Sequence, residues 1–178
     1  MTLQERYQKE IVPALKSKFG ITNANAVPKV TSVTVSVGLS QGIKDPKILE
    51  VVEQTLRRIT GQQPVKTKAK KSIASFKLRE GQVVGMMVTL RGKRMWDFLT
   101  RLNAFTFPRI RDFRGISSKI IDGRGNMSIG FRENLAFPEI RPDEVERVHG
   151  LQVTVSTTAG TRERGDALLR ALGFPFSN

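Results

Sequence analysis

Val30-Thr-Ser-Val-Thr-Val-Ser-Val-Gly38 is the stretch that decides the fold, because valine alternates in it with serine and threonine. Val33, Val35 and Val37 fall on one side of an extended chain, and Ser32, Thr34 and Ser36 fall on the other. This period of two predicts a half-buried β-strand with one apolar face and one hydroxyl-bearing face. A parallel sheet buried on both faces would show continuous apolar runs instead.

Helices are predicted both before and after this strand in the sequence. Thr2 and Glu5 form a capping-box pattern, apolar residues follow at helical spacing, and Gly20 supplies a stop, which predicts a helix over about 3–19. Asp45-Pro46 is typical of a helix start, and Gly61 ends that helix. Helices are also predicted over about 93–105 and 162–172.

A short extended segment is predicted from Pro64 to about Lys70, and further strands are predicted near 83–91, 127–132 and 151–158. The fold class is therefore α+β, an antiparallel or mixed β-sheet with helices packed on one face and an open polar face. We expect residues 1–178 to form one domain, with mobile loops near 72–81 and 107–126.

The charge of the chain is strongly one-sided. Thirty lysines and arginines oppose sixteen acids, for a formal net charge of +14. Residues 61–125 hold fifteen basic and four acidic residues, whereas residues 126–178 hold six and seven. Phosphate polymers are the usual partners of such a field and anionic membranes come second, so the middle third is the predicted nucleic-acid footprint.

Residues for catalysis are missing from the sequence. There is no cysteine, which excludes thiolate chemistry and favours a reducing, cytoplasmic home, and no stretch has the apolar length of a membrane span. The single histidine, His149, has no second histidine or cysteine to act with, and Asp143, Glu144 and Glu146 are better read as a solvated helix start than as a Mg²⁺ site. Gly123-Arg-Gly125 is only a tight turn. We expect no enzyme activity, cofactor or metal.

Three basic clusters are candidate phosphate contacts. Lys66, Lys68, Lys70 and Lys71 form the densest cluster, and in an extended chain the first three would point the same way at about phosphate spacing. Lysines that protect an exposed edge strand are the alternative. Further clusters lie at Arg91, Lys93 and Arg94, and in the loop that carries Arg109, Arg111, Arg114 and Arg124.

Neutral polar residues on the strands are candidates for specific recognition. Ser36, Gln62 and Thr89 could converge on one rim of the open face, where hydroxyl and amide groups suit a ribose 2′-OH or a base edge. The face lacks the stacking aromatics of an RNA-recognition motif. An ordinary solvated sheet face is the alternative.

A series of segments, in order along the chain, resembles the bacterial large-subunit ribosomal protein L-five family over essentially the whole length. The segments are Val27-Pro-Lys-Val30, Gly61-Gln-Gln-Pro64, Thr67-Lys-Ala-Lys-Lys-Ser72, Phe76-Lys-Leu-Arg79, Val88-Thr-Leu-Arg-Gly92, Met95-Trp96, Pro108-Arg-Ile-Arg-Asp-Phe-Arg-Gly115, Asp122-Gly-Arg-Gly-Asn126, Phe137-Pro-Glu-Ile140 and Phe174-Pro-Phe176.

The resemblance implies a structural protein of the large ribosomal subunit that binds 5S rRNA and attaches it to 23S rRNA in the central protuberance. It further implies contact with the P-site tRNA, for which the candidate residues are Ser75, Phe76, Lys77 and Arg79. A bridge to small-subunit protein S-thirteen, or a 23S rRNA contact, is expected at Arg109, Arg111 and Arg114. One departure is Ser36, which stands where the family usually has asparagine and so counts against a bidentate contact there.

Two rival functions remain open at this point. An RNA-modifying enzyme would need a cofactor loop or a catalytic constellation, and the sequence offers neither. A nonspecific basic RNA-binding or nucleoid protein, or one bound to membrane surfaces, would explain the charge but not its uneven distribution or the polar sheet face.

Overall fold

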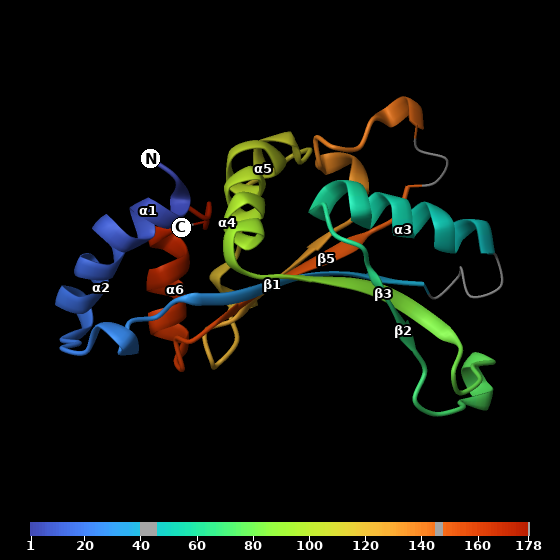
Figure 1. The fold of residues 1–178 in the computed structure, drawn as a ribbon, viewed down its shortest axis with the longest axis horizontal. Helices are drawn as coiled ribbons and strands as arrows, with labels where there is room; N and C mark the ends of the chain where they lie inside the picture. The colour runs from blue at the N-terminus through green and yellow to red at the C-terminus, as the bar shows by residue number, and fades with distance from the viewer. Residues whose placement is uncertain (40–45, 145–147, 178) are drawn as a thin grey trace. The chain divides into compact units, whose positions relative to one another are not determined.

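The computed structural model describes residues 1–39, 46–144 and 148–177 and has the predicted α+β architecture. Its antiparallel sheet has the strand order β2-β3-β1-β5-β4 (Figure 1). The strands are β1 Val30–Gly38, β2 Val65–Lys68, β3 Val83–Leu90, β4 Met127–Phe131 and β5 Leu151–Thr157. Each predicted strand is therefore confirmed to within a few residues, and β2 is an edge strand.

The helices follow the predicted order. They are α1 Leu3–Arg6, α2 Val12–Phe19, α3 Pro46–Thr60, α4 Gly92–Arg101, α5 Phe107–Arg109 and α6 Arg162–Ala171. Two π-helical turns, Tyr7–Ile11 and Leu102–Thr106, join α1 to α2 and α4 to α5. The predicted N-cap at Asp45 lies outside the described residues, as does Glu146 of the predicted acidic helix start.

Local sequence signals explain the helix ends at the N-terminus. The Glu5 N–H donates to Thr2 Oγ1 at 3.2 Å, and the Thr2 N–H donates to Glu5 Oε2 at 3.0 Å, which completes the predicted capping box. Gly20 ends the helix with φ of 61°, a left-handed conformation that glycine adopts without steric cost. The prediction of helix over 3–19 is confirmed.

The residue contacts group into two compact units. The first unit contains Met1–Val33, Leu90–Ile129 and Thr154–Asn178. Its core includes Trp96, Phe98 and Phe107. The Tyr7 hydroxyl donates to the Pro28 oxygen at 2.9 Å. Segments far apart in sequence thus complete this unit.

The second unit contains Thr34–Thr89 and Gly130–Val153. Helix α3 runs alongside its strands (Figure 1), and the α3 side chains Val52, Leu56 and Ile59 are fully buried. On the strands, the buried residues are Val35, Val37, Met86 and Val88. Residues of opposite parity, including Ser36 and Thr89, stay partly exposed, so the predicted division into an apolar and a polar face holds within this unit.

The two predicted loops contain more structure than their composition indicates. Residues 74–76 form a 3₁₀ turn closed by an antiparallel bridge between Ile73 and Leu78. The prediction of a loop over 107–126 is wrong at its start, because Phe107–Arg109 continues the helix and Phe107 is 1% exposed. Ile116 and Ile121 are also buried, which composition alone could not reveal.

Candidate nucleic-acid interface

The polar face of the second unit carries hydroxyl groups that have no hydrogen-bond partner among the described residues. Thr34 and Ser36 on β1 and Thr89 on β3 are partly exposed. Their hydroxyls make no hydrogen bond to any described residue, and no residue of this face is aromatic. Such groups are free to donate to, and accept from, a polar partner.

Gln62 and Thr89 are brought together, as the sequence predicts. Gln62 Nε2 donates to the Thr89 carbonyl oxygen at 3.3 Å. Because a carbonyl oxygen can only accept, this contact fixes the orientation of the amide and leaves Gln62 Oε1 as an acceptor without a partner among the described residues. Thr60 Oγ1 also accepts from the Gln62 N–H at 3.3 Å, which holds the second residue after the end of α3.

Ser36 lies on β1, next to β3 in the sheet, with its side chain on the polar face. The Leu39 N–H donates to the Val84 oxygen at 2.9 Å. An antiparallel ladder continued from that pair would place Thr34 rather than Ser36 opposite Thr89. Ser36 therefore shares the face with Gln62 and Thr89, while Thr34 is the nearer hydroxyl.

The lysine cluster differs from its predicted geometry. Lys66 Nζ lies 3.0 Å from Glu53 Oε2 of α3, and Gln63 Nε2 donates to Glu53 as well. The β2–β3 register shifts between Thr67 and Lys68, and β2 ends there. The expectation that Lys66, Lys68 and Lys70 share one face of a regular strand is therefore wrong. Lys68, Lys70 and Lys71 are exposed, whereas Lys66 already has a counter-ion.

No sequence signal could have identified Glu53 as this partner, because it lies on a different element and thirteen positions away. The pairing of Lys66 with Glu53 depends on how α3 packs against the edge of the sheet. Arg91 belongs to the first unit, where it is exposed and directly precedes α4.

The segment between β2 and β3 is a hydrogen-bonded hairpin that projects from the ends of these strands (Figure 1). Ile73 and Leu78 exchange two backbone hydrogen bonds of 2.9 and 3.1 Å. Beyond them, Lys77 has φ of 52° and Phe76 is 77% exposed, with Ser75 and Arg79 exposed nearby. The predicted residues therefore gather at a tip that presents an aromatic ring and two cations.

The arginine-bearing segment of the first unit displays its cations and is anchored by its apolar residues. Arg109, Arg111 and Arg114 are exposed, and none forms an ion pair with any residue that the structure describes. The Phe113 ring stacks on Phe107, with centroids 5.4 Å apart. The segment thus keeps its backbone fixed while its arginines face outward.

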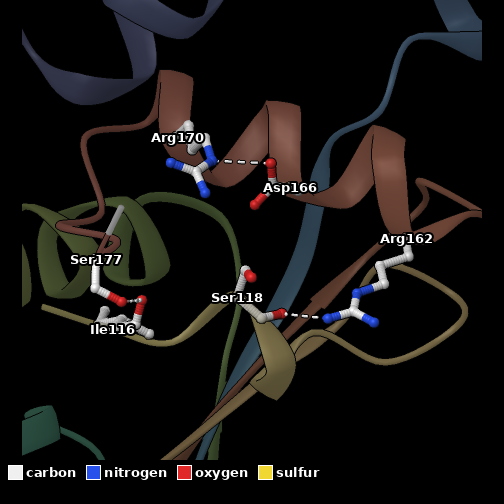
Figure 2. Close-up of polar contacts among 6 residues, drawn as sticks. All are labelled: Ile116, Ser118, Arg162, Asp166, Arg170 and Ser177. Carbon is white, nitrogen blue, oxygen red and sulfur yellow. Dashed lines mark hydrogen bonds and ion pairs between the residues drawn. The ribbon is translucent and has the colours of Figure 1, made fainter.

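Contacts to α6 and to the residues after it hold the end of this segment (Figure 2). Arg162 Nη2 donates to the Ser118 oxygen at 2.9 Å, and Ser177 Oγ donates to the Ile116 oxygen at 3.3 Å. The Ile116 N–H donates to the Pro175 oxygen at 2.7 Å. Arg170 pairs with Asp166 at 2.8 Å on α6 itself, so these two charges neutralise each other.

His149 has the environment of a structural residue. Its Nδ1–H donates to the Gly150 oxygen at 3.2 Å, and its buried Nε2 has no hydrogen-bond partner among the residues that the structure describes. Burial lowers the pKa of His149 from its usual 6.5. Among the described residues, no group of histidine, aspartate and glutamate is arranged to hold a metal, and no described helix is long and apolar enough to cross a membrane.

Comparison with known proteins finds similar sequences over nearly the full chain. The family model described as ribosomal protein L5 matches residues 23–79, and the model of the C-terminus of that family matches residues 83–176. The "Large ribosomal subunit protein uL5" of Halothermothrix orenii is 51% identical over 98% of both chains. That of Microcystis aeruginosa is 53% identical over 98% of this chain and 97% of its own.

A basic α+β protein with an open polar face and these matches is a structural protein of the large ribosomal subunit, and not an enzyme. Its charge and the residues displayed on its surface are consistent with that class. The chain belongs to the uL5 family.

Proposed function

We propose that this chain binds 5S rRNA through the polar face of its second unit and helps to attach that RNA to 23S rRNA in the central protuberance. The observation that carries the proposal is the hydrogen bond from the Gln62 amide to the Thr89 carbonyl, which orients that amide and leaves its oxygen and the Thr89 hydroxyl without partners among the described residues. These groups can accept from and donate to a ribose 2′-OH or a base edge. Lys68, Lys70 and Lys71 add exposed charge for phosphates in the same unit.

The hairpin tip is the proposed contact with P-site tRNA. Phe76 offers a stacking surface, and Lys77 and Arg79 offer cations for the phosphates around it. This division of labour assigns 5S rRNA to the sheet and tRNA to the hairpin.

The arginines of the first unit are the proposed contact with 23S rRNA or with small-subunit protein S-thirteen. The exposure of Arg109, Arg111 and Arg114, without ion-pair partners among the described residues, supports an intermolecular role. A cross-linker at Arg111 in assembled ribosomes identifies which of the two lies opposite. A failure to cross-link to any other chain would argue against this role.

The binding of the full chain to 5S rRNA, measured beside an unrelated RNA, DNA of equal length and anionic vesicles, tests the proposal. We expect the highest affinity for 5S rRNA at physiological salt. Equal affinity for all three nucleic acids would favour a nonspecific basic RNA-binding or nucleoid protein, because phosphate contacts alone carry no sequence information.

A further inference from the structure

Phe105 is a large apolar residue that the fold turns out of the core. Its side chain is 56% exposed, whereas Phe98 and Phe107 of the same helical segment are 2% and 1% exposed. Residues 98 and 105 are seven apart, almost two turns of an α-helix, so an uninterrupted helix would bury both on one face. The exposure of Phe105 therefore needs a cause in the backbone.

The π-helical turn Leu102–Thr106 supplies that cause. The Phe107 N–H donates to the Leu102 oxygen five residues back, so the turn contains one residue more than a turn of α-helix. The buried positions shift to Thr106 and Phe107, and Phe105 is left outside. Turns of this kind are often found at functional sites.

Arginines lie on both sides of the exposed ring. Arg101 stands four residues before Phe105, is half-buried and has an interaction inside the protein, whereas Arg109 stands four residues after Phe105 and is exposed. Arg109, Arg111 and Arg114 have no ion-pair partner among the described residues. The nearest acids in the sequence are Asp97, eight residues before Phe105 on α4, and Asp112, seven residues after it and beyond the end of α5.

We propose that Phe105 is a stacking platform for an unpaired nucleobase of ribosomal RNA, with the flanking arginines contacting the phosphates next to it. An aromatic face attracts any base, and adjacent cations hold the backbone of the strand. An acidic protein segment would use the arginines but would gain little from the exposed ring, so RNA is the better match. The proposal rests on the rRNA-binding role proposed above but uses a different surface from the 5S rRNA site.

A stacking contact can be separated from simple charge attraction with an abasic probe. The probes are a single-stranded oligo(A) decamer and an abasic decamer of equal charge, bound to the full chain. All variants carry Phe76→Leu, so that the other strongly exposed phenylalanine does not contribute. We expect Phe105 and Phe105→Tyr chains to prefer oligo(A) over the abasic strand by about fivefold or more, as for one base–aromatic stack.

Phe105→Leu keeps an apolar helix former but removes the ring face, so the preference for oligo(A) should disappear while the thermal unfolding temperature stays the same. A preference that survives in Phe105→Leu overturns the proposal. A photo-reactive phenylalanine analogue at position 105, in assembled large subunits, then identifies the partner. We expect a cross-link to an unpaired rRNA nucleotide, and a cross-link only to protein overturns the assignment. Thr89→Val, measured on 5S rRNA, reports separately on the proposed function.

Discussion

Gln62 holds Thr89 through the main chain and not through its hydroxyl. The amide donates to the Thr89 carbonyl, which ties the second residue after α3 to the end of β3 across 27 positions. The Thr89 hydroxyl makes no hydrogen bond to a described residue. The two residues therefore form one polar group in which the Gln62 side chain has a structural role beside its proposed binding role, and the Thr89 side chain has the proposed binding role alone.

Thr89→Val should reduce the affinity for 5S rRNA without changing the stability of the protein. Valine keeps the β-branched shape and removes only the hydroxyl, which costs about 1–2 kcal/mol of binding free energy when the bond to RNA is lost. The slope of affinity on salt concentration should not change, since no phosphate contact is removed. Titration at several salt concentrations, with thermal unfolding as the control, measures both.

Gln62→Ala should lower both the affinity and the unfolding temperature, because it also removes the bond to β3. Ser36→Asn should be neutral or improve binding, since it restores the group that is usual in the family. If Thr89→Val and Gln62→Ala bind like the parent while lysine variants lose discrimination against other RNAs, specificity is electrostatic and the assignment is wrong.

The lysines should contribute unequally to RNA binding. Each phosphate contact adds about 0.7–0.9 to the slope of log affinity on log salt concentration. Lys68→Ala and Lys70→Ala should each lower the slope by about that amount, whereas Lys66→Ala should lower it less, because Glu53 already balances Lys66. The triple variant should then lose about two units and not three.

Glu53→Gln is the matched test of this difference. It removes the counter-ion while keeping a side chain that can bond Gln63, so Lys66 becomes available to a phosphate and the slope should rise. Equal slopes for all three single lysine variants would show that the contact with Glu53 gives way to RNA.

Shortening the hairpin should impair tRNA placement and spare 5S rRNA binding. Ile73 and Leu78 form a hydrogen-bonded pair, so residues 74–77 can be replaced by Asn-Gly, a two-residue turn that keeps the two strands in register. This removes Ser75, Phe76 and Lys77 from the tip. Toe-printing of P-site tRNA on ribosomes, beside 5S rRNA titration of the free protein, separates the two effects. A loss of 5S rRNA binding would contradict the division of labour.

The same hairpin should exchange its amide hydrogens faster than the sheet. Its backbone hydrogen bonds lie among exposed side chains, with little buried apolar surface to hold them closed. Protection of residues 72–81 equal to that of β3 would contradict the predicted mobility.

Gly165→Ala should destabilise the first unit strongly. A Cβ at this position would lie 2.4 Å from Gly125 Cα and 2.6 Å from its oxygen, and both are backbone atoms that cannot rotate away. Overpacking of this kind costs about 1–3 kcal/mol or more of unfolding free energy. Gly123→Ala, two residues from Gly125, meets nothing within 4 Å and has no left-handed φ, so it should be nearly neutral. Urea denaturation of both variants checks the difference.

Acid should destabilise the protein partly through His149. Burial lowers its pKa in the folded chain below the 6.5 of the unfolded chain, so the unfolded state takes up the proton more readily. Its contribution to stability is fully present above pH 6.5 and is lost as the pH falls toward the folded-state pKa. In His149→Gln, the unfolding free energy should depend less on pH in that window. An identical pH dependence would assign the acid sensitivity to carboxylates.

Sequence patterns within single helices and strands predicted the fold well. They could not predict the contacts between side chains of different elements. The alternation of Val33, Val35 and Val37 is a local property, and the strand followed it. The pairing of Lys66 with Glu53 depends on how α3 meets the sheet edge, and the sequence pattern of a single element cannot predict that packing. The exposure of Phe105 depends on a π-helical turn, and its burial would have been the natural expectation from the spacing of Phe98 and Leu102.

The candidate site likewise has some features that the sequence predicts and others that it does not. Gln62 and Thr89 could be placed together because Gln62 follows the end of a helix and Thr89 lies late in a strand, so both were expected at one rim of the sheet. The absence of a regular hydrophobic period located the hairpin tip. It could not predict that hydrogen bonds between Ile73 and Leu78 close the hairpin. The apolar anchors of the arginine segment, such as Phe107 and Ile116, lie in a stretch whose glycine and arginine content indicates a loop.

The segments of the first unit have a consequence for the order in which the molecule can fold. Lys29 N–H donates to Thr158 Oγ1 across 129 positions, and Gly125 needs Gly165 beside it. Neither contact can form until Thr158 and Gly165, respectively, have been synthesised, and contacts of such high sequence separation form slowly. The second unit, whose residues end at Val153, is under no such delay. A nascent chain can therefore form the hairpin and the second-unit part of its sheet before it can form these first-unit contacts. A chain whose synthesis stops early therefore lacks the contacts that complete the first unit.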